Sequence, residues 1–324
     1  MTRESSSGLY LLAVEITSRC NLRCRHCYGD FYDKDAISMD DAAISTIVSF
    51  VERMRIPNVT LTGGEPLLAG SRVFRWAREL QDVGAAVTLT TNGLLAPKYP
   101  SNWFRVFSRV QLSIDGTREE HDRLRGSGTY ARVLEALEHL KRGGLRQIVL
   151  MMTVHSGNVS SLLDVSSFAT EQKVEFAIER YTGPSTGDLR MLTAEEFHGA
   201  LEFCQTHKAH CLDPLMETVR HRHLPDFQIR HRGGCTAGIA ALAITAGLDV
   251  LPCVRLRSPI GNLDVEDLED LWEHSPALKR LRNRRSFESC GSCVHVAVCG
   301  GCRAAAFAVD GDFLGRDPGC WWPQ

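Results

Sequence analysis

The run Cys20-Asn21-Leu22-Arg23-Cys24-Arg25-His26-Cys27 places three cysteines within eight residues. It follows residues 10–16, an apolar stretch typical of a β-strand. A four-iron cluster takes four cysteine thiolates, so a tight group of three can hold a cluster whose fourth iron has no protein ligand. We therefore predict an iron–sulfur site at the end of the first strand, with one iron open to another molecule.

Length and composition are those of a globular protein. The chain has 324 residues, of which 44% are hydrophobic and 23% are charged. The formal net charge of -2 gives no electrostatic reason for binding nucleic acid or a membrane surface. Residues 1–8 lack the apolar segment of a secretion signal, and no run of 18 apolar residues occurs. We predict a cytoplasmic protein with neither nucleic acid nor membrane as a partner.

The chain has 12 cysteines, of which three lie near the front and seven lie from Cys235 to Cys320. Disulfides are rare in a reducing cytoplasm, so these two groups are expected to bind metal. In the rear group, Cys290-x2-Cys293 and Cys299-x2-Cys302 also have the spacing of a zinc ribbon. A structural zinc site uses four ligands and the rear group has three more, which favours clusters and leaves zinc as the alternative.

Strands and helices alternate through the first half of the chain. Strands are expected at residues 10–16, 59–61, 86–90, 110–114, 148–153 and 174–178. Helices are expected at residues 39–54, where Ser38 can cap the first turn, and at 74–83, 130–141 and 159–170. These repeats predict an α/β fold in which a parallel sheet with outer helices forms a partial (β/α)6 TIM-like barrel.

The pattern changes after residue 180. A helix is expected at residues 193–206, where Thr193 and Glu196 form a capping box. An irregular stretch covers 213–232, and from Cys235 short loops are expected with one helix near 265–284. We predict a barrel domain over 1–190, a helix and linker over 191–232, and a cysteine-rich C-terminal domain over 233–324.

Small and polar residues follow three of the predicted strands. Gly63-Gly64-Glu65-Pro66 comes after the second strand, Asn92 after the third, and Ser113 near the end of the fourth. Glycine has no Cβ, so the backbone can approach a ligand closely, although a plain strand-to-helix turn would use the same residues. Ligands bind at the carboxyl ends of the strands in α/β barrels, so these turns and the cysteine run predict one shared site.

These features resemble the radical S-adenosylmethionine (radical SAM) superfamily. Its Cys-x3-Cys-x2-Cys motif matches Cys20, Cys24 and Cys27, and its Gly-Gly-Glu-Pro motif matches residues 63–66. The resemblance implies that the open iron of a 4Fe-4S cluster binds S-adenosylmethionine. It also implies that this cofactor lies near Gly63, Gly64, Glu65, Asn92 and Ser113. One electron, supplied by an external flavodoxin or ferredoxin, would then release a 5′-deoxyadenosyl radical that abstracts a substrate hydrogen.

The rear cysteines resemble the SPASM extension of that superfamily, which holds auxiliary clusters. By this resemblance one auxiliary 4Fe-4S cluster is held by Cys290, Cys293, Cys299 and Cys320, and a second by Cys235, Cys253 and Cys302. Two spacings differ from the family pattern, since five residues separate Gly247 from Cys253 and two separate Cys299 from Cys302. The second auxiliary cluster has either an open iron or an unusual ligand, for which His231 is the nearest candidate. Three 4Fe-4S clusters are expected in total.

Few residues are candidates for a direct role in the reaction. Glu179 and Arg180 end the sixth strand and are predicted to face the barrel mouth, as a substrate base or clamp or as a surface ion pair. Cys204 and Cys211 are either small packing residues or donors of a hydrogen atom to a substrate radical. Residues 220–223, Arg-His-Arg-His, either contact an anionic substrate or form a solvated loop.

These residues predict a radical SAM iron–sulfur oxidoreductase and leave its substrate open. The first hypothesis is maturation of a ribosomally made peptide by dehydrogenation or crosslinking, since residues 122–130 resemble peptide-maturing SPASM enzymes. Against it, only about nine residues precede the first strand, so no fused leader-recognition domain is expected. The second hypothesis is oxidation or epimerisation of a small natural product, such as an aminoglycoside sugar or cyclitol. A third class, an iron–sulfur carrier or sensor, has no use for the Gly-Gly-Glu-Pro turn.

Overall fold

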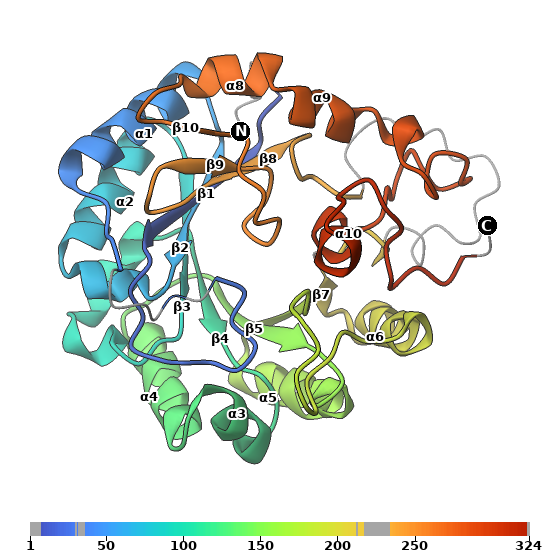
Figure 1. The fold of residues 1–324 in the computed structure, drawn as a ribbon. Helices are drawn as coiled ribbons and strands as arrows, with labels where there is room; N and C mark the ends of the chain where they lie inside the picture. The colour runs from blue at the N-terminus through green and yellow to red at the C-terminus, as the bar shows by residue number, and fades with distance from the viewer. Residues whose placement is uncertain (1–7, 30, 32–35, 212, 217–233, 323–324) are drawn as a thin grey trace.

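The computed structural model describes residues 8–29, 31, 36–211, 213–216 and 234–322 (Figure 1). Strands β1 to β6 pair in parallel, each with the next along the chain. Their bounds are Leu11–Thr17 (β1), Asn58–Gly63 (β2), Ala86–Thr91 (β3), Arg109–Ser113 (β4), Ile148–Val154 (β5) and Glu175–Arg180 (β6). The partial (β/α)6 barrel expected from the sequence is confirmed.

Helices surround this curved sheet (Figure 1). They are α1 (Asp41–Arg53), α2 (Arg72–Asp82), α3 (Arg118–Arg125), α4 (Thr129–Arg142) and α5 (Leu162–Gln172). The short 3-10 helices η1 (Pro66–Ala69), η2 (Ala96–Lys98), η3 (Ser101–Val106) and η4 (Val159–Ser161) lie in the connections. The polar helix α3 is absent from the sequence prediction, because it has few apolar positions that could show a helical period.

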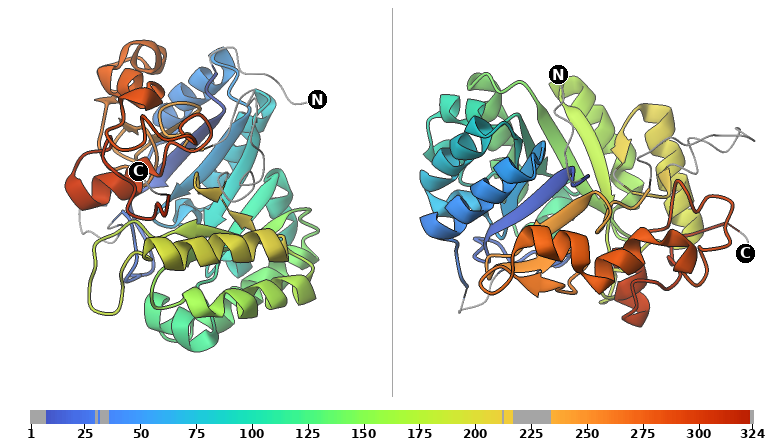
Figure 2. Two further views of the ribbon diagram at one scale, coloured as in Figure 1. Left: turned by 90° about the vertical axis from the view of Figure 1, so that its right-hand side faces the viewer. Right: turned by 90° about the horizontal axis from the view of Figure 1, so that it is seen from above.

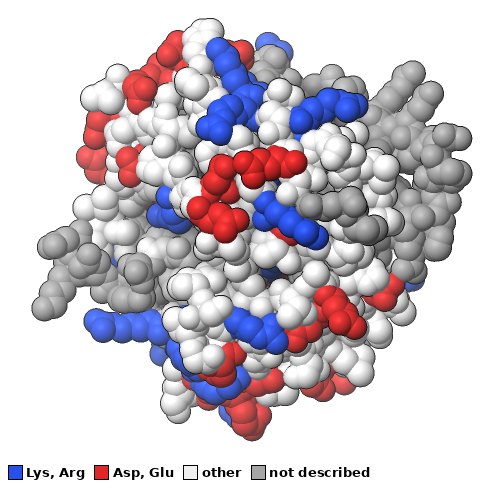
Figure 3. Space-filling model, turned by 45° about the vertical axis from the view of Figure 1, so that its right-hand side comes forward, with Lys and Arg blue, Asp and Glu red and all other residues white. Residues whose placement is uncertain are grey.

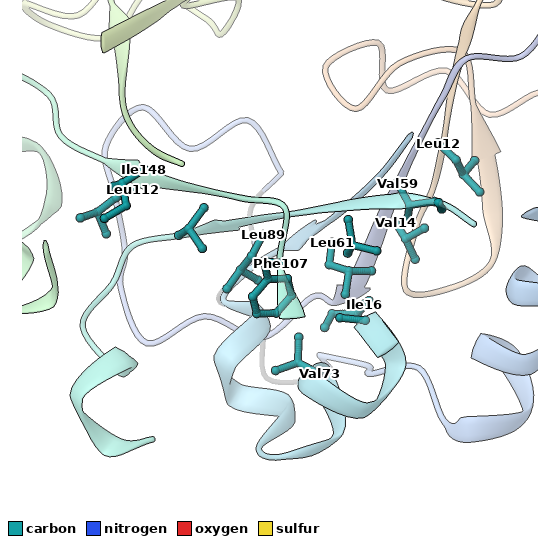
Figure 4. Close-up of a cluster of buried hydrophobic side chains, with 14 of the residues drawn as sticks. Leu12, Val14, Ile16, Val59, Leu61, Val73, Leu89, Phe107, Leu112 and Ile148 are labelled. Atoms are coloured by element: carbon teal, nitrogen blue, oxygen red, sulfur yellow. The ribbon is translucent and has the colours of Figure 1, made fainter. Parts of the chain in front are cut away.

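Side chains along each strand point alternately to the two faces of the sheet. Leu12, Val14 and Ile16 of β1 are fully buried. They form one apolar cluster with residues of β2 to β5 and with Val73 of α2 (Figure 4). The apolar positions therefore pack against the helices. Intervening residues such as Thr62 of β2 point into the barrel, which leaves a polar interior in which a site can form.

The C-terminal part of the chain adds strands to the barrel sheet. β8 (Ala241–Ile244) pairs in parallel with β1, and β9 (Asp249–Leu251) and β10 (Gly261–Asn262) follow in antiparallel pairing. At the other edge, β7 (His210–Cys211) pairs with β6. The described strands form one sheet in the order β10-β9-β8-β1-β2-β3-β4-β5-β6-β7. The expectation of loops after Cys235 is wrong here, because β8 is short and buried on both faces and so shows no alternation.

The remaining helices are α6 (Ala194–His207), α8 (Leu268–His274), α9 (Pro276–Arg282) and α10 (Arg303–Asp310), with η5 (Arg284–Ser286). The expected helix at 265–284 is two helices, because Ser275 is extended before Pro276, with φ −53° and ψ 124°. A proline disfavours the helical conformation in the residue before it. The helices from α8 onward lie along one side of the barrel (Figures 1 and 2).

Two helix starts were expected from cap residues. The capping box of α6 is confirmed, since Thr193 and Glu196 exchange side-chain to backbone hydrogen bonds. The cap of α1 is Asp40 rather than Ser38, and its carboxylate accepts the Ala43 N–H at 2.9 Å. The Ser38 hydroxyl instead lies 2.6 Å from that of Thr17, at the end of β1.

The surface carries charges of both signs. Acidic and basic side chains are intermixed on the face drawn in Figure 3, in keeping with the net charge of -2. Among the described residues, no helix combines the length and the apolar character that crossing a membrane would take.

Candidate active site

A cavity lies at the carboxyl ends of the barrel strands. It is lined by Met151 of β5 and by polar residues from successive strands, Thr62, Thr90, Ser113, Thr153 and Glu179. Cys20, Cys24 and Cys27 line the same cavity, because the loop that carries them follows β1 directly. The three cysteines and the residues at the strand ends therefore surround one space.

The Gly63-Gly64 turn packs against the chain that enters the cysteine loop. The Gly64 N–H donates to the Thr17 carbonyl oxygen and the Glu65 N–H to that of Arg19, both at 2.8 Å. A Cβ on Gly63 would collide with the Thr17 carbonyl oxygen, and one on Gly64 with that of Arg19. Gly63 also has a φ of 119°, which disfavours other residues. The two glycines thus allow the close backbone contact that sets where the cysteine loop begins.

Glu65 lies beneath this cavity and is fully buried. Its carboxylate accepts hydrogen bonds from the Leu67 N–H at 3.0 Å, the Thr91 hydroxyl at 2.8 Å and the Asn92 N–H at 2.9 Å. Burial raises the pKa of Glu65, and these donors oppose the shift. Glu65 therefore joins the turn after β2 to the turn after β3.

Four of the five residues predicted to contact S-adenosylmethionine line the cavity, namely Gly63, Gly64, Asn92 and Ser113. Asn92 is held by the cysteine loop as well as by Glu65. The side-chain Nδ2 of Asn92 donates to Asn21 Oδ1 at 2.9 Å, and its side-chain Oδ1 accepts the Leu94 N–H at 3.0 Å. The cofactor-facing turn and the cysteine loop are thus hydrogen-bonded to each other.

Cys20 and Cys24 are poor thiolates without a bound cation. Burial raises the pKa of Cys20 to about 12, and the negative charges of Glu65, Cys24 and Cys27 act in the same direction. Burial also raises the pKa of Cys24, against the opposing charge of Arg125. Metal binding supplies the positive charge that such thiolates require. Three soft sulfur donors fit a 4Fe-4S cluster that keeps one iron for another ligand.

A second hollow is lined by Cys290, Cys293, Cys299 and Cys320. The Gly301 N–H donates to Cys299 Sγ at 3.3 Å, and the His295 N–H donates to Cys293 Sγ at 3.4 Å. Arg303 Nη2 lies 3.8 Å from Cys290 Sγ. These donors stabilise thiolates, and four soft ligands around one hollow fit a fully ligated 4Fe-4S cluster.

Cys235, Cys253 and Cys302 form a third cysteine group. Burial raises the pKa of Cys235, and the negative charge of Cys253 adds to the shift. Burial raises the pKa of Cys302 to about 12, against the opposing charges of Arg180 and Arg255. Three soft donors fit a cluster that lacks one protein ligand. His231, the candidate for that ligand, and the run 220–223 lie outside the described residues.

The zinc alternative requires side chains that converge on one ion. Within the described part of the chain, no group of three or more His, Cys, Asp or Glu residues converges in this way. A four-iron cluster spreads its thiolates over different iron atoms and does not need that convergence.

Two family models match this chain. Residues 14–166 match the radical SAM superfamily, and residues 235–294 match SPASM, an iron–sulfur cluster-binding domain. The chain belongs to the radical SAM superfamily. It is an iron–sulfur radical enzyme with a SPASM domain, whose cofactors are 4Fe-4S clusters and S-adenosylmethionine.

Relatives of this radical SAM enzyme align over most of its length. An AdoMet-dependent heme synthase of Methanosarcina barkeri is 28% identical over 96% of this chain and 95% of its own. The mycofactocin maturase MftC of Mycobacterium ulcerans is 29% identical over 95% of this chain and 87% of its own. SuiB of Streptococcus suis, solved with the precursor peptide SuiA, has a TM-score of 0.78 at 17% identity, over 98% of this chain and 77% of its own. The likeness to SuiB shows the shared fold.

This radical SAM enzyme has a buried network of charged side chains that could not be predicted from its sequence. The Arg125 guanidinium contacts Asp115 and lies 3.4 Å from His26 Nε2 and 4.0 Å from Cys24 Sγ. Burial alone would raise the pKa of Asp115, but Arg125 above all holds that pKa well below its usual range. The sequence places Arg125 before Gly126 in a polar stretch and carries no signal that this stretch returns to the cysteine loop.

The wall of the cavity next to the SPASM domain carries opposite charges. The Glu179 carboxylate accepts a hydrogen bond from the Thr153 hydroxyl at 3.2 Å. Arg255, which follows β9, donates to the Arg180 carbonyl oxygen at 2.8 Å. Burial would lower the pKa of Arg255, but the negative charges of Cys302 and Glu179 raise it overall. Arg255 is also missed by the sequence analysis, since only folding brings the region after β9 to the barrel mouth.

The sequence predicts Arg180 as a substrate clamp or as part of a surface ion pair, and its contacts support an ion pair that is buried. It borders the cavity, but its guanidinium is buried and bonded to two carboxylates. Asp213 accepts from it twice at 2.7 Å, and Asp317 accepts at 2.6 and 3.0 Å. It also lies 4.2 Å from the ring centroid of Phe197. With these partners, Arg180 joins β6 to the C-terminal domain.

Cys204 and Cys211 are core residues, and the structure does not bring them to the cavity. Both are buried, in α6 and β7. A hydrogen bond with Cys204 and burial raise the pKa of the Cys211 thiol. Of the two roles predicted for them, packing is the one that their position supports, and hydrogen donation stays an untested prediction.

Proposed function

We propose that this enzyme uses S-adenosylmethionine to abstract a hydrogen atom from a ribosomally made peptide and so dehydrogenates or crosslinks it. The observation that carries the proposal is the shared cavity at the barrel mouth. Three cysteines suited to an open cluster, the turns after β2 and β3, and the carboxylate of Glu179 surround one space. A cofactor bound by the cysteines and a substrate beside Glu179 would therefore meet in it.

Different residues of the cavity would hold the cluster, S-adenosylmethionine and the substrate. Cys20, Cys24 and Cys27 would hold the cluster, while Gly63, Gly64, Asn92 and Ser113 would contact S-adenosylmethionine and Glu65 would position Asn92. When bound, the cluster and cofactor supply a one-electron reductive cleavage that makes hydrogen abstraction possible. The barrel walls exclude water from the reaction. Glu179 is the candidate base that would take a proton from the substrate radical. The rear cysteines would hold an auxiliary cluster, which supplies the acceptor for the remaining electron when bound.

The position of the cavity and the relatives of this chain bear on the kind of substrate. The cavity lies at the barrel mouth, where one side chain of a flexible peptide could reach the residues that line it. The relation to mycofactocin maturases and the precursor peptide held by SuiB support this choice.

A small natural product is the second candidate substrate. The heme synthase relative aligns with this chain over 95% of its own length, so nearly all of its sequence has an aligned region here. Oxidation of a small molecule fits this relation better than epimerisation, because neither Cys204 nor Cys211 lines the cavity as a hydrogen donor.

The enzyme class is tested by cleavage of S-adenosylmethionine. Anaerobically reconstituted protein, incubated with dithionite and S-adenosylmethionine, is expected to release 5′-deoxyadenosine, measured by liquid chromatography. The Cys24→Ala variant is expected to lose this activity. Absence of cleavage by the unaltered protein, with and without candidate substrates, would contradict the proposal.

The substrate is tested with molecules encoded or made by neighbouring genes. A short precursor peptide is expected to lose a hydrogen pair, seen by mass spectrometry, and the Glu179→Gln variant is expected to lose this product while still cleaving S-adenosylmethionine. Turnover of a small molecule with no change in the peptide would favour the second candidate. In either case a flavodoxin- or ferredoxin-type protein would donate the electron, in a cytoplasm whose reducing conditions keep the thiols free for iron.

We further propose three 4Fe-4S clusters, one at each cysteine group. The reconstituted protein is then expected to contain about 12 iron atoms per chain, four for each cluster. The Cys290→Ala/Cys293→Ala double variant is expected to fall to about eight iron atoms, because one site is lost. Iron near four per chain together with bound zinc would refute the auxiliary clusters.

A further inference from the structure

Arg125, the last residue of α3, lies between a cluster-ligating cysteine and a buried carboxylate. Its Nη1 is 4.0 Å from Cys24 Sγ, and its Nη2 is 3.4 Å from His26 Nε2. Its Nε donates to Asp115, whose side chain is fully buried. The Arg125 side chain is itself only 11% exposed. One edge of the guanidinium thus faces the sulfur and another faces the carboxylate.

The surrounding contacts fix the guanidinium in this place. Asp115 Oδ1 accepts the Thr153 N–H at 3.0 Å, and Asp115 Oδ2 lies 3.2 Å from His26 Nε2. A backbone hydrogen bond of 3.0 Å from the Arg25 N–H to the Leu124 carbonyl oxygen ties the cysteine loop to the end of α3. Because loop, helix end and carboxylate are all held, the cation stays next to the sulfur.

A cation in this position favours the more negative redox state of a cluster. Reduction adds one electron, taken here from the external donor, and breaks no bond. A fixed positive charge in a low-dielectric surrounding stabilises that electron, and charge near the ligand sulfurs is one of the factors that set a cluster's potential. Asp115 acts in the opposite direction, but the charge of Arg125 has the larger effect on Cys24.

We propose that Arg125 raises the reduction potential of the cluster held by Cys20, Cys24 and Cys27, and that Asp115 fixes Arg125 in place. Because the cluster at these cysteines belongs to the proposed function, this role rests on that function. Arg125 acts through the Cys24 sulfur and is a positioning residue.

The test is a potentiometric titration of the reconstituted, anaerobic protein, followed by electron paramagnetic resonance of the reduced clusters. The front cluster is identified as the signal that changes when S-adenosylmethionine is added. Arg125→Gln is expected to lower the ratio of reduced to oxidised cluster about tenfold at a fixed solution potential, a shift of about 59 mV to more negative values. Arg125→Lys keeps the cation and is expected to shift the potential less.

Two further variants separate charge from packing. Asp115→Asn removes the opposing charge but keeps an amide oxygen that can accept the Arg125 N–H, so Arg125 stays in place. The potential is therefore expected to shift to more positive values, which a loss of packing alone would not do. Arg123→Gln is the matched control on the same helix. The Arg123 side chain is 44% exposed and pairs with Asp188 at the surface, so its loss is expected to leave the potential unchanged.

The outcomes are distinct. A wild-type potential in Arg125→Gln with full iron content would overturn the role of Arg125 and leave the proposed function standing.

If Arg125→Gln fails to assemble its clusters, the Arg125→Gln/Asp115→Asn double variant decides, because it removes both buried charges together. A more negative potential in the double variant than in Asp115→Asn alone supports the role, and an equal potential in the two overturns it. If the unaltered protein shows no signal that responds to S-adenosylmethionine, the proposed function fails, and the role of Arg125 with it.

Discussion

Gly64 is the residue whose missing side chain is most closely tied to the site. Its backbone N–H is bonded to Thr17, and a Cβ would meet the carbonyl oxygen of Arg19, the residue before Cys20. A backbone oxygen cannot swing away as the end of a flexible side chain can, so the strand end and the cysteine loop would separate.

Gly64→Ala is therefore expected to displace the cysteine loop and reduce iron at the front cluster. Iron per chain is expected to fall by about four, the content of one cluster, as measured by iron analysis and by loss of the signal that responds to S-adenosylmethionine. Gly199→Ala is the control, because a Cβ at this position of α6 meets nothing within 4 Å. It is expected to keep full iron content and to gain about 0.5–1 kcal/mol of stability. Equal iron content in the two variants would contradict the packing role of Gly64.

At the scale of elements, the start of α6 depends on local hydrogen bonds. The Thr193 hydroxyl accepts the Glu196 N–H at 3.2 Å, and the Glu196 carboxylate accepts the Thr193 N–H at 2.8 Å. Arg190 holds the same carboxylate through two bonds of 2.7 and 2.8 Å and contributes most to lowering the pKa of Glu196 to about 2. These bonds satisfy N–H groups that the first turn of a helix leaves free.

Thr193→Ala is expected to lower the free energy of unfolding by about 1 kcal/mol, the usual cost of losing such a cap. Thr206→Ala is the control in the same helix, where the hydroxyl donates to the Glu202 carbonyl oxygen of its own helix at 2.9 Å. Its effect is expected to stay within about 0.5 kcal/mol. Urea unfolding followed by circular dichroism measures both variants. Equal destabilisation would show that the capping box has no special role.

At the scale of the whole molecule, Arg180 connects the barrel to the cysteine-rich domain. Its partner Asp317 also accepts the Cys302 N–H at 2.6 Å and the Gly319 N–H at 2.8 Å. Through Asp317, the Arg180 side chain of β6 is thus linked to the backbone of Cys302 and of Gly319, the residue before Cys320. Cys302 and Cys320 are both predicted to bind clusters. Removing the cation would leave two buried carboxylates without their partner, which is far more costly than losing a surface pair.

Arg180→Gln is expected to destabilise the fold by about 3–5 kcal/mol and to reduce auxiliary iron. The thermal midpoint and the iron content of reconstituted protein measure the effect. Arg190→Gln is the control, because Arg190 also binds one carboxylate through two bonds but is 43% exposed. It is expected to cost at most about 1 kcal/mol and to leave iron unchanged. A wild-type iron content and midpoint in Arg180→Gln would contradict the linking role.

Much of the architecture could be predicted because its signals are local. The alternation that buries Leu12, Val14 and Ile16 depends only on strand geometry, and the cap at Thr193 depends on neighbours in sequence. Local signals fail where a strand is buried on both faces, and where a single residue divides one expected helix into two. The strand β8, buried on both faces, and the division of the helix at Pro276 are the two cases.

The parallel barrel and the family could be predicted from the sequence, because cysteine spacing, glycine turns and apolar period are properties of short segments. The contacts of Arg125, Arg180 and Arg255 could not, because each side chain meets groups far away along the chain. Arg125 meets Cys24 from 101 residues away, and Arg180 meets Asp317 from 137. The sequence shows which side chains are charged. The electrostatic interaction energy of each one depends on its burial and on partners that only the folded chain brings together.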